Sequence, residues 1–257
     1  MNYCIICRDQ DKSQIIKEKL IEEISHNYNE ESPQIVIAIG GDGTILRASH
    51  MYPEAIIFGI HTGHLGFYAN YSVDEIDLLI NDINNNTYKI NQFDLLTANV
   101  LDSNGNCIID NALNEVTIVS PLKVVSLDVY IDDIYFERFR GTGLCISTPN
   151  GSTAYNKSLN GCVIDHDLKT IQLTEIAGIN SNAYRTLSSP LVLSSKRIIR
   201  LESSEALDLY VTVDHIAKQV SFKSIVLKYD NKHLKMGYHN NEDFMRRIHR
   251  TFLISKE

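Results

Sequence analysis

The feature that most restricts the fold is an apolar run, Ile35–Ile39, that leads directly into the sequence GGDGT of Gly40–Thr44. The run is rich in β-branched residues and no polar residue interrupts it, which predicts a strand with both faces buried. Such strands lie in parallel sheets that helices cover. We therefore expect a helix after the glycines, over Thr44–Met51, and a parallel sheet around the strand.

The rest of residues 1–86 continues this alternation of strands and helices. Apolar runs predict strands at Tyr3–Cys7 and Ile56–Ile60, and apolar spacing predicts a helix over Lys12–Ile24. The sequence SVDE of Ser72–Glu75 has the form of a capping box and predicts the start of a helix that reaches Ile83. Residues 1–86 are therefore expected to form a Rossmann-like α/β domain.

Residues 87–240 show short alternating runs instead. Val125–Ile131 has one apolar and one polar face, and Asp102–Asn106 is a strong hairpin-turn signal. Asp132-Asp133 is expected to turn the chain into the next strand. Further strands are predicted at Ile134–Phe139, Ile198–Leu201, Leu209–Val213 and Ile225–Tyr229. This half is expected to be an antiparallel, sandwich-like β-rich domain.

The last predicted element is a helix over Asn241–Phe252, where Phe244, Ile248 and Phe252 follow i, i+4 spacing. We expect this helix to pack back on the N-terminal domain. The predicted fold class is α/β, with an N-terminal α/β domain and a C-terminal β-rich domain.

Composition excludes several classes of protein. The chain of 257 residues is 44% hydrophobic and 22% charged, which is typical of a globular protein. A net charge of −8 without a basic block argues against a nucleic-acid partner. Five scattered cysteines do not form a disulfide framework, and no apolar run has the length of a signal peptide or membrane span. We expect a cytoplasmic protein without a membrane partner.

The GGDG sequence carries the clearest chemistry. Glycines at the carboxyl end of a buried strand let backbone N–H groups approach a phosphate. The charge of Asp42 would repel a bare phosphate, so it suits a metal-bridged phosphate or a hydroxyl that loses its proton. Both roles belong to phosphoryl transfer. The alternative is that Asp42 only caps the helix.

Two polar segments of the second half are further candidates. Asn114 and Glu115 offer the donors and acceptors that hold vicinal ribose hydroxyls, or they form a strand edge that faces water. Residues 147–158, with the sequence STPNGSTAYNKS, supply N–H groups, small hydroxyls and the aromatic face of Tyr155. The alternative is a simple helix start that Ser152 or Thr153 caps.

The chain resembles the bacterial-type NAD kinases (ATP-NAD kinases), which phosphorylate the adenosine-ribose 2′-hydroxyl of NAD. GGDG alone also occurs in diacylglycerol kinases and phosphofructokinases, but the combination of segments is highly specific. The segments follow the family's order and spacing over nearly the whole chain: GGDGTILRASH (Gly40–His50), GIHTGHLGFYA (Gly59–Ala69), LNEVTI (Leu113–Ile118), FERFRGTGLCISTPNGSTAYNKSL (Phe136–Leu159), LTEIAGIN (Leu173–Asn180) and VDH (Val213–His215).

The resemblance implies a role for each matched residue. Asp42 matches the family's essential aspartate, proposed as the base for the 2′-hydroxyl, and Gly43 lies against the NAD phosphates. Asn114 and Glu115 match a pair that contacts NAD, and Ala177 matches a wall of the site. The segment that cradles adenine and ribose is Thr153, Ala154, Tyr155, Asn156, Lys157 and Ser158. Arg140, Asp214 and His215 are further matched positions, and Thr142 is a further candidate binding residue.

The resemblance also implies Mg²⁺, a site between the two domains, and a homo-oligomer, tetramer or dimer. The phosphoryl donor would be ATP, another triphosphate or polyphosphate, and the product NADP. Two rival functions stay open. One is another GGDG kinase that acts on a lipid or a sugar phosphate, and the other is an NAD-binding sensor without catalysis.

The sequence departs from the family pattern at three positions. Thr142 stands where many relatives have the aspartate of FRGDG, so this position supplies no charge. Asn160 replaces the first glycine of a Gly-Gly pair, and asparagine tolerates positive φ better than most residues. Asn150 replaces a more usual threonine or serine.

Three other motifs favour structural roles. Cys4 and Cys7 lie three residues apart on a predicted strand, so their thiols point to opposite faces and are expected to be packed. The glycines around His61 and His64 favour a shaped loop over a metal site. The arginines of the last helix, Arg246, Arg247 and Arg250, are expected to form a solvated face or to support the C-terminal end of the helix dipole.

Overall fold

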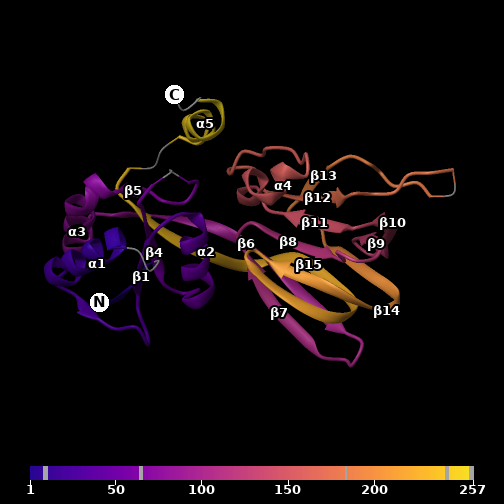
Figure 1. The fold of residues 1–257 in the computed structure, drawn as a ribbon, viewed down its shortest axis with the longest axis horizontal. Coiled ribbons are helices and arrows are strands. Elements are labelled where there is room, and N and C mark those ends of the chain that lie inside the picture. The colour runs from indigo at the N-terminus through magenta and orange to yellow at the C-terminus, as the bar shows by residue number, and fades with distance from the viewer. Residues whose placement is uncertain (8–10, 64–65, 183, 241–242, 255–257) are drawn as a thin grey trace. The chain divides into compact units, whose positions relative to one another are not determined.

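The computed structural model describes residues 1–7, 11–63, 66–182, 184–240 and 243–254. The chain divides into two compact units (Figure 1). The first unit contains Met1–Phe93 and His233–Glu257, and the second contains Asp94–Lys232. Within the described ranges, no helix has the length and apolar character that crossing a bilayer requires.

The first unit is built on a parallel sheet. Its strands pair in the order β2-β1-β3-β4, and the end of β15 (Ile216–Tyr238) joins β4 in parallel through Lys235 and Met236. The predicted parallel sheet is therefore confirmed. The remaining elements are β1 (Asn2–Cys7), α1 (Asp11–Glu23), β2 (Asn27–Tyr28), β3 (Ile35–Ile39), α2 (Asp42–Met51), β4 (Ile56–His61), β5 (Tyr71–Ser72), a 3₁₀ turn (Val73–Glu75), α3 (Ile76–Asn85) and the start of β6 (Lys89–Asp102).

Helices cover both faces of this sheet, which explains the uninterrupted apolar strands. Ile35, Ile37 and Ile39 share one core with the apolar residues of α1 and α3. On the opposite face, the buried Ile45 of α2 lies beside Gly59 of β4. The capping box before α3 is present as predicted, with Glu75 accepting from the N–H of Ser72 at 2.8 Å.

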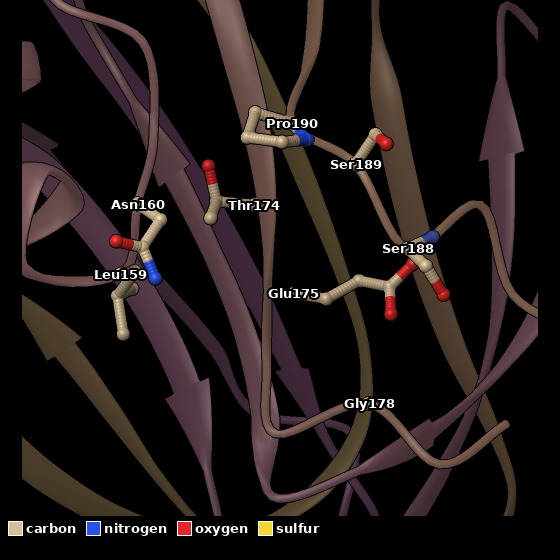
Figure 2. Close-up of a pocket in the computed structure, with 8 residues that line it drawn as sticks. All are labelled: Leu159, Asn160, Thr174, Glu175, Gly178, Ser188, Ser189 and Pro190. Atoms are coloured by element: carbon tan, nitrogen blue, oxygen red, sulfur yellow. Dashed lines mark hydrogen bonds between the residues drawn. The ribbon is translucent and has the colours of Figure 1, made fainter.

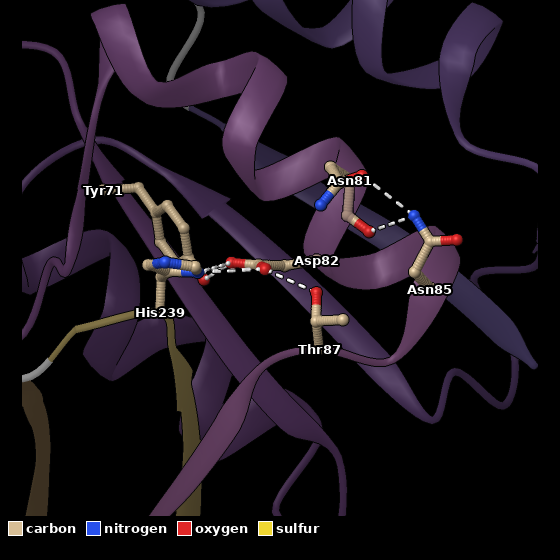
Figure 3. Close-up of polar contacts among 6 residues, drawn as sticks. All are labelled: Tyr71, Asn81, Asp82, Asn85, Thr87 and His239. Carbon is tan, nitrogen blue, oxygen red and sulfur yellow. Dashed lines mark hydrogen bonds and ion pairs between the residues drawn. The ribbon is translucent and has the colours of Figure 1, made fainter.

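A polar network around the buried Asp82 joins three segments of the first unit (Figure 3). Asp82 of α3 is fully buried and accepts hydrogen bonds from the hydroxyls of Tyr71 at 2.9 Å and Thr87 at 2.7 Å. Nδ1 of His239, just after β15, lies 3.0 Å from the same carboxylate. The network attaches the end of β15 to α3.

The second unit is β-rich and antiparallel. Its strands pair in the order β13-β12-β11-β8-β14-β15, while β10 pairs with β9 and β6 with β7. The inward-facing residues of these strands form one shared apolar core. The elements are β7 (Cys107–Ala112), β8 (Glu115–Val119), β9 (Val125–Ile131), β10 (Ile134–Gly141), β11 (Gly143–Ser147), a 3₁₀ turn (Asn150–Thr153), α4 (Tyr155–Ser158), β12 (Thr170–Ile176), β13 (Leu191–Ser194), β14 (Ile199–Val213) and most of β15.

Both predicted turns of this unit form. Asp102 accepts from the N–H groups of Asn104 at 2.9 Å and Asn106 at 2.8 Å, which closes the β6–β7 hairpin. Asp132 and Asp133 have φ values of 50° and 64°, between β9 and β10. Aspartate tolerates this left-handed region better than most residues, so the turn chemistry agrees with the sequence.

The predicted strand boundaries are wrong at β14 and β15. Two expected strands, Ile198–Leu201 and Leu209–Val213, are parts of the single strand β14 (Ile199–Val213). Its pairing with β15 shifts register between Glu202 and Leu207, where polar residues interrupt the apolar pattern. The backbone keeps its pairing on both sides of this irregularity, so the strand continues where the side-chain pattern breaks.

The last helix belongs to the first unit, as expected. Helix α5 (Phe244–Ile248) begins after Asp243, whose carboxylate accepts from the N–H groups of Met245 and Arg246, and it continues as a π-helical turn over His249–Leu253. Asn241, where the prediction began, lies outside the described residues. The ring of Phe252 lies 5.4 Å from that of Phe67, which confirms packing on the N-terminal part of the chain.

Candidate active site

The glycine-rich segment places Asp42 in the first turn of α2. The helix begins at Asp42, two residues earlier than predicted, with Gly41 as its N-cap and no side-chain cap bond. The alternative that Asp42 caps the helix is therefore wrong. Gly43 is exposed beside it, so the backbone at this helix start is open to a ligand.

A second segment holds the carboxylate of Asp42. Oδ2 accepts from the N–H of Phe67 at 2.9 Å, and Oδ1 accepts from the N–H of Tyr68 at 3.1 Å. Gly66 precedes these residues, and a Cβ added there would lie 2.2 Å from Oδ1. The close approach requires glycine at 66. The sequence reasoning missed Phe67 and Tyr68 as functional residues, although both lie in the family-like segment Gly59–Ala69.

Asn114 lies in the turn between β7 and β8, and Glu115 is the first residue of β8; both are buried, so they do not form a strand edge that faces water. Their exposed fractions are 6% and 7%. The carboxylate of Asp214 accepts from the N–H groups of Leu113 at 2.9 Å, Asn114 at 2.7 Å and Glu115 at 3.3 Å. Asp214 itself has a left-handed φ of 52° and donates its N–H to the carbonyl of Glu115 at 3.0 Å. This turn is therefore held by one distant carboxylate.

The environment of Glu115 changes its proton affinity. Burial raises the pKa of the Glu115 carboxyl to about 8, and the negative charge of Asp214 adds to the rise. The N–H groups of Asn156 and Tyr155 oppose it. At neutral pH the carboxyl therefore holds a proton, and it can donate as well as accept a hydrogen bond.

The hydroxyl-rich segment packs directly on this turn. The N–H of Thr148 donates to the carbonyl of Asn114 at 2.9 Å, and the hydroxyl of Thr148 donates to the carbonyl of Leu113 at 2.6 Å. A Cβ on Gly151 would lie 2.1 Å from the oxygen of Asn114, so only glycine fits there. The structure therefore brings the two polar segments of the second half together.

Neither predicted cap residue of this segment caps a helix. The hydroxyl of Ser152 bonds both backbone groups of Ile164, and that of Thr153 donates to the carbonyl of Asn150 at 3.2 Å. Helix α4 follows Ala154 and has no side-chain cap. The local sequence predicted that one of these hydroxyls caps the helix, but in the folded chain each of them bonds a backbone group elsewhere.

The residues of α4 differ in burial. Asn156 is fully buried, and its Oδ1 accepts from the hydroxyl of Thr174 at 2.7 Å. Tyr155 is 45% exposed, and Lys157 and Ser158 are also exposed. Asn156 thus anchors the helix, and Tyr155 remains available as a packing face.

A pocket of about 400 Å³ contains two of the predicted residues, Thr142 and Tyr155. Apolar and aromatic side chains dominate its lining, which suits a planar heterocycle. The pocket is formed entirely by residues of the second unit: Val119, Pro121, Thr142, Tyr155, Ile176, Tyr210, Thr212 and Ala217.

A second cavity of about 260 Å³ has polar walls (Figure 2). Asn160 lines it with a φ of 61°, which confirms that asparagine supports the turn in place of glycine. Glu175 accepts from the hydroxyl of Thr186 at 2.7 Å and from the N–H of Ser188 at 2.8 Å, and so holds one wall. The complete lining is Leu159, Asn160, Thr174, Glu175, Gly178, Ser188, Ser189 and Pro190.

The remaining predicted residues lie around the ends of β10, β12 and β14. The guanidinium carbon of Arg140 lies 4.1 Å from the ring centre of Tyr184, a cation–π contact. Ala177 is exposed in the turn after β12 with a φ of 48°, and His215 is exposed in the turn after β14. The carbonyl of Arg140 accepts from the N–H of Ile179 at 2.8 Å, which places Arg140 beside the Ala177 turn.

Three weaker motifs are now placed. Cys4 is buried and Cys7 half-buried, and both are free thiols. His64 lies outside the described residues, and in the part of the chain that the structure describes no three His, Cys, Asp or Glu side chains form a metal-binding group. The prediction that the arginines of the last helix are solvated is wrong for Arg247, whose exposed fraction is 8%.

Two family models and several curated relatives match this chain. The family model of the ATP-NAD kinase N-terminal domain matches residues 5–88, and that of the C-terminal domain matches residues 103–227. NAD kinase 1 of Listeria innocua is 38% identical over 262 residues, which cover 98% of this chain and 99% of the relative. The NAD kinase of Staphylococcus aureus strain JH9 is 37% identical over 267 residues, with 100% and 99% covered.

Solved structures share the fold. The crystal structure of yeast NADH kinase complexed with NADH has a TM-score of 0.86 at 20% identity and covers 100% of this chain and 89% of that chain. An Archaeoglobus fulgidus NAD kinase in complex with ATP has a TM-score of 0.79 at 23% identity, with 99% and 100% covered. The α/β and β-rich fold is confirmed, and the full-length similarity shows that the chain belongs to the NAD kinase family.

Proposed function

We propose that this protein transfers the γ-phosphoryl group of ATP to the adenosine-ribose 2′-hydroxyl of NAD, which produces NADP and ADP. Its membership of the NAD kinase family supports this reaction. The relatives solved with NADH and with ATP support both classes of substrate. One observation carries the proposal. The carboxylate of Asp42, the first residue of α2, accepts hydrogen bonds from the backbone N–H groups of Phe67 and Tyr68.

Asp42 is the proposed base for the 2′-hydroxyl of NAD, which attacks the γ-phosphorus of ATP. Its carboxylate accepts the proton of the 2′-hydroxyl as the bond from O2′ to the γ-phosphorus forms. The bond from the γ-phosphorus to the bridging oxygen breaks in line, and ADP leaves. The exposed backbone at Gly43 lies at the positive end of α2 and stabilises the negative charge of the transferred group.

The second unit supplies the groups that bind NAD. Protonated Glu115 and the amide of Asn114 offer donors and acceptors to ribose hydroxyls. The exposed ring of Tyr155 packs against a planar base, in the pocket that Thr142 also lines. Positioning of this kind supplies a large part of the rate acceleration in phosphoryl transfer.

Mg²⁺ is the expected cofactor. Protein sites hold it through one or two carboxylates together with substrate phosphates, so a cluster of three protein ligands is not required. The mechanism uses the carboxylate of Asp42 as the base, so no residue of the chain is assigned as a metal ligand and the substrate phosphates would hold the ion. When bound, Mg²⁺ neutralises charge on the triphosphate.

The proposal also covers the cellular location, the oligomeric state and the domain limits of the enzyme. Cytoplasmic location agrees with the five free cysteines. A homo-oligomer, tetramer or dimer, agrees with exposed apolar side chains of β10, since Ile134 is 70% and Tyr135 53% exposed. We keep residues 1–86 and 87–240 as the proposed domain limits. Sedimentation equilibrium of the purified protein tests the oligomer, and a single monomeric species contradicts it.

The test of the reaction is conversion of NAD to NADP by purified protein with ATP and Mg²⁺, read by an NADP-specific dehydrogenase. We expect product from the wild type and almost none from Asp42→Asn, which keeps the shape and removes the charge. Equal turnover by a folded Asn variant contradicts the base role. Product with polyphosphate alone extends the donor range.

Two failures point to the rival functions. If NAD binds but neither ATP nor polyphosphate yields NADP, the protein is an NAD-binding sensor. If NAD does not bind and the protein phosphorylates diacylglycerol or a sugar phosphate, it is another GGDG kinase. In that case Asn114 and Glu115 variants leave turnover unchanged.

A further inference from the structure

The last helix carries a buried arginine that contacts the segment holding Asp42. Arg247 is 8% exposed, whereas its neighbour Arg246 on α5 is exposed. Its guanidinium donates to the carbonyl oxygen of Phe67, and Nη2 donates to Oδ1 of Asn70 at 2.9 Å. A buried cation is costly unless it is hydrogen-bonded, so these contacts are strong constraints on both partners.

The contacts of Arg247 and Asp42 meet in one peptide segment. Phe67 donates its N–H to Asp42 at 2.9 Å and accepts the guanidinium of Arg247 at its carbonyl. Tyr68 supplies the second N–H to Asp42 at 3.1 Å. The segment is therefore bound on one side by the catalytic carboxylate and on the other by the C-terminal helix. The planar fork of arginine binds Phe67 and Asn70 together, which a lysine ammonium does not reproduce.

We propose that Arg247 is a positioning residue: it fixes the 66–70 segment so that its two N–H groups orient the carboxylate of Asp42 for phosphoryl transfer. Its effect on turnover rests on the proposed function, whereas its effect on the segment does not. The residues proposed to hold the ribose and the base of NAD, Asn114, Glu115 and Tyr155, belong to the second unit, so loss of Arg247 is expected to lower kcat more than it raises KM for NAD.

Two variants and a matched control test the proposal. Arg247→Met keeps the apolar stem and removes every donor, and Arg247→Lys keeps one charged donor. Arg246→Met makes the same change at an exposed position of the same helix. We expect Arg247→Met to lower kcat by about 10- to 100-fold, since small displacements of catalytic groups have effects of this size. Arg247→Lys should recover part of the loss, and Arg246→Met should match the wild type.

Amide hydrogen exchange at Phe67 and Tyr68 is the readout that does not need turnover. We expect Arg247→Met to accelerate exchange of both amides by about tenfold or more through local opening, and Arg246→Met to leave it unchanged. Unchanged exchange in Arg247→Met overturns the proposal, whatever happens to kcat. If Arg247→Met fails to fold, Arg247→Lys carries both measurements.

A double variant separates positioning from a general loss of stability. In the Asp42→Asn background the carboxylate to be oriented is gone, so adding Arg247→Met should change kcat by less than about twofold. A full multiplicative loss there overturns the proposal. A wild type that makes no NADP contradicts the proposed function, and the exchange measurement still decides whether Arg247 holds the segment.

Discussion

The carboxylate of Asp214 accepts the backbone N–H of Asn114 at 2.7 Å, although the two residues are 100 positions apart in the sequence. The same carboxylate holds the N–H groups of Leu113 and Glu115. Charge-assisted bonds of this kind are stronger than neutral ones. Asp214 therefore holds the Asn114-Glu115 turn through its backbone.

Replacing Asp214 should weaken NAD binding more than turnover. Asp214→Asn removes the charge that holds three N–H groups, so we expect KM for NAD to rise about tenfold with a smaller change in kcat. Initial-rate kinetics with varied NAD measure the effect. Asp208→Asn changes an exposed aspartate of β14, the strand that precedes Asp214, and should have no effect. An unchanged KM in Asp214→Asn would show that the turn keeps its conformation without the charge.

Glu115 should make stability depend on pH. The folded protein holds a proton at Glu115 up to a pKa of about 8, whereas the unfolded chain releases it near 4.5. Between these two pH values the folded state therefore binds more protons than the unfolded chain. The contribution of Glu115 to the free energy of unfolding falls as pH rises from about 4.5 to 8. Glu115→Gln cannot ionise and should lose this dependence.

Urea unfolding at pH values inside and above the window checks the Glu115 prediction. The advantage of Glu115→Gln over the wild type should grow as pH rises. Glu205→Gln, a change at an exposed carboxyl of β14, should show the pH profile of the wild type. A constant difference between Glu115→Gln and the wild type at all pH values would contradict the raised pKa.

A methyl group at position 66 should disturb catalysis without unfolding the protein. The Cβ of Gly66→Ala would lie 2.2 Å from Oδ1 of Asp42, so the carboxylate must move. We expect kcat to fall by about 10- to 100-fold with little change in KM. Gly63→Ala is the matched control, because a Cβ there meets no atom within 4 Å. Wild-type kcat in Gly66→Ala would mean that the orientation of Asp42 is not critical.

The network around Asp82 should matter for stability. Asp82→Ala leaves the buried hydroxyl of Tyr71 without its acceptor and removes the partner of the exposed Thr87, so we expect the free energy of unfolding to fall by about 3 kcal/mol. Asn81→Ala, at an exposed position of the same helix, should cost less than about 0.5 kcal/mol. Chemical denaturation measures both values. Equal stabilities would contradict the role of the network (Figure 3).

The sequence by itself determined the elements that local patterns encode. The uninterrupted run Ile35–Ile39 predicted β3 to the residue, and the turn residues at Asp102–Asn106 predicted the β6–β7 hairpin. Backbone preference and the period of apolar side chains act over a few residues, so they are visible in the chain. The motifs around Asp42 and Asn114 were visible for the same reason, since each is a short segment.

Only the tertiary structure decided which distant residues hold those motifs. Asp42 is bound by N–H groups about 25 residues further along the chain, and Phe67 by an arginine 180 residues away. The burial of Arg247 and Glu115 contradicted the exposed faces that charged residues usually indicate. A hydrogen bond between distant segments leaves no period or spacing in the sequence, because only the folded backbone brings its two ends together. The sequence thus located the chemistry, and the fold decided its orientation and proton affinity.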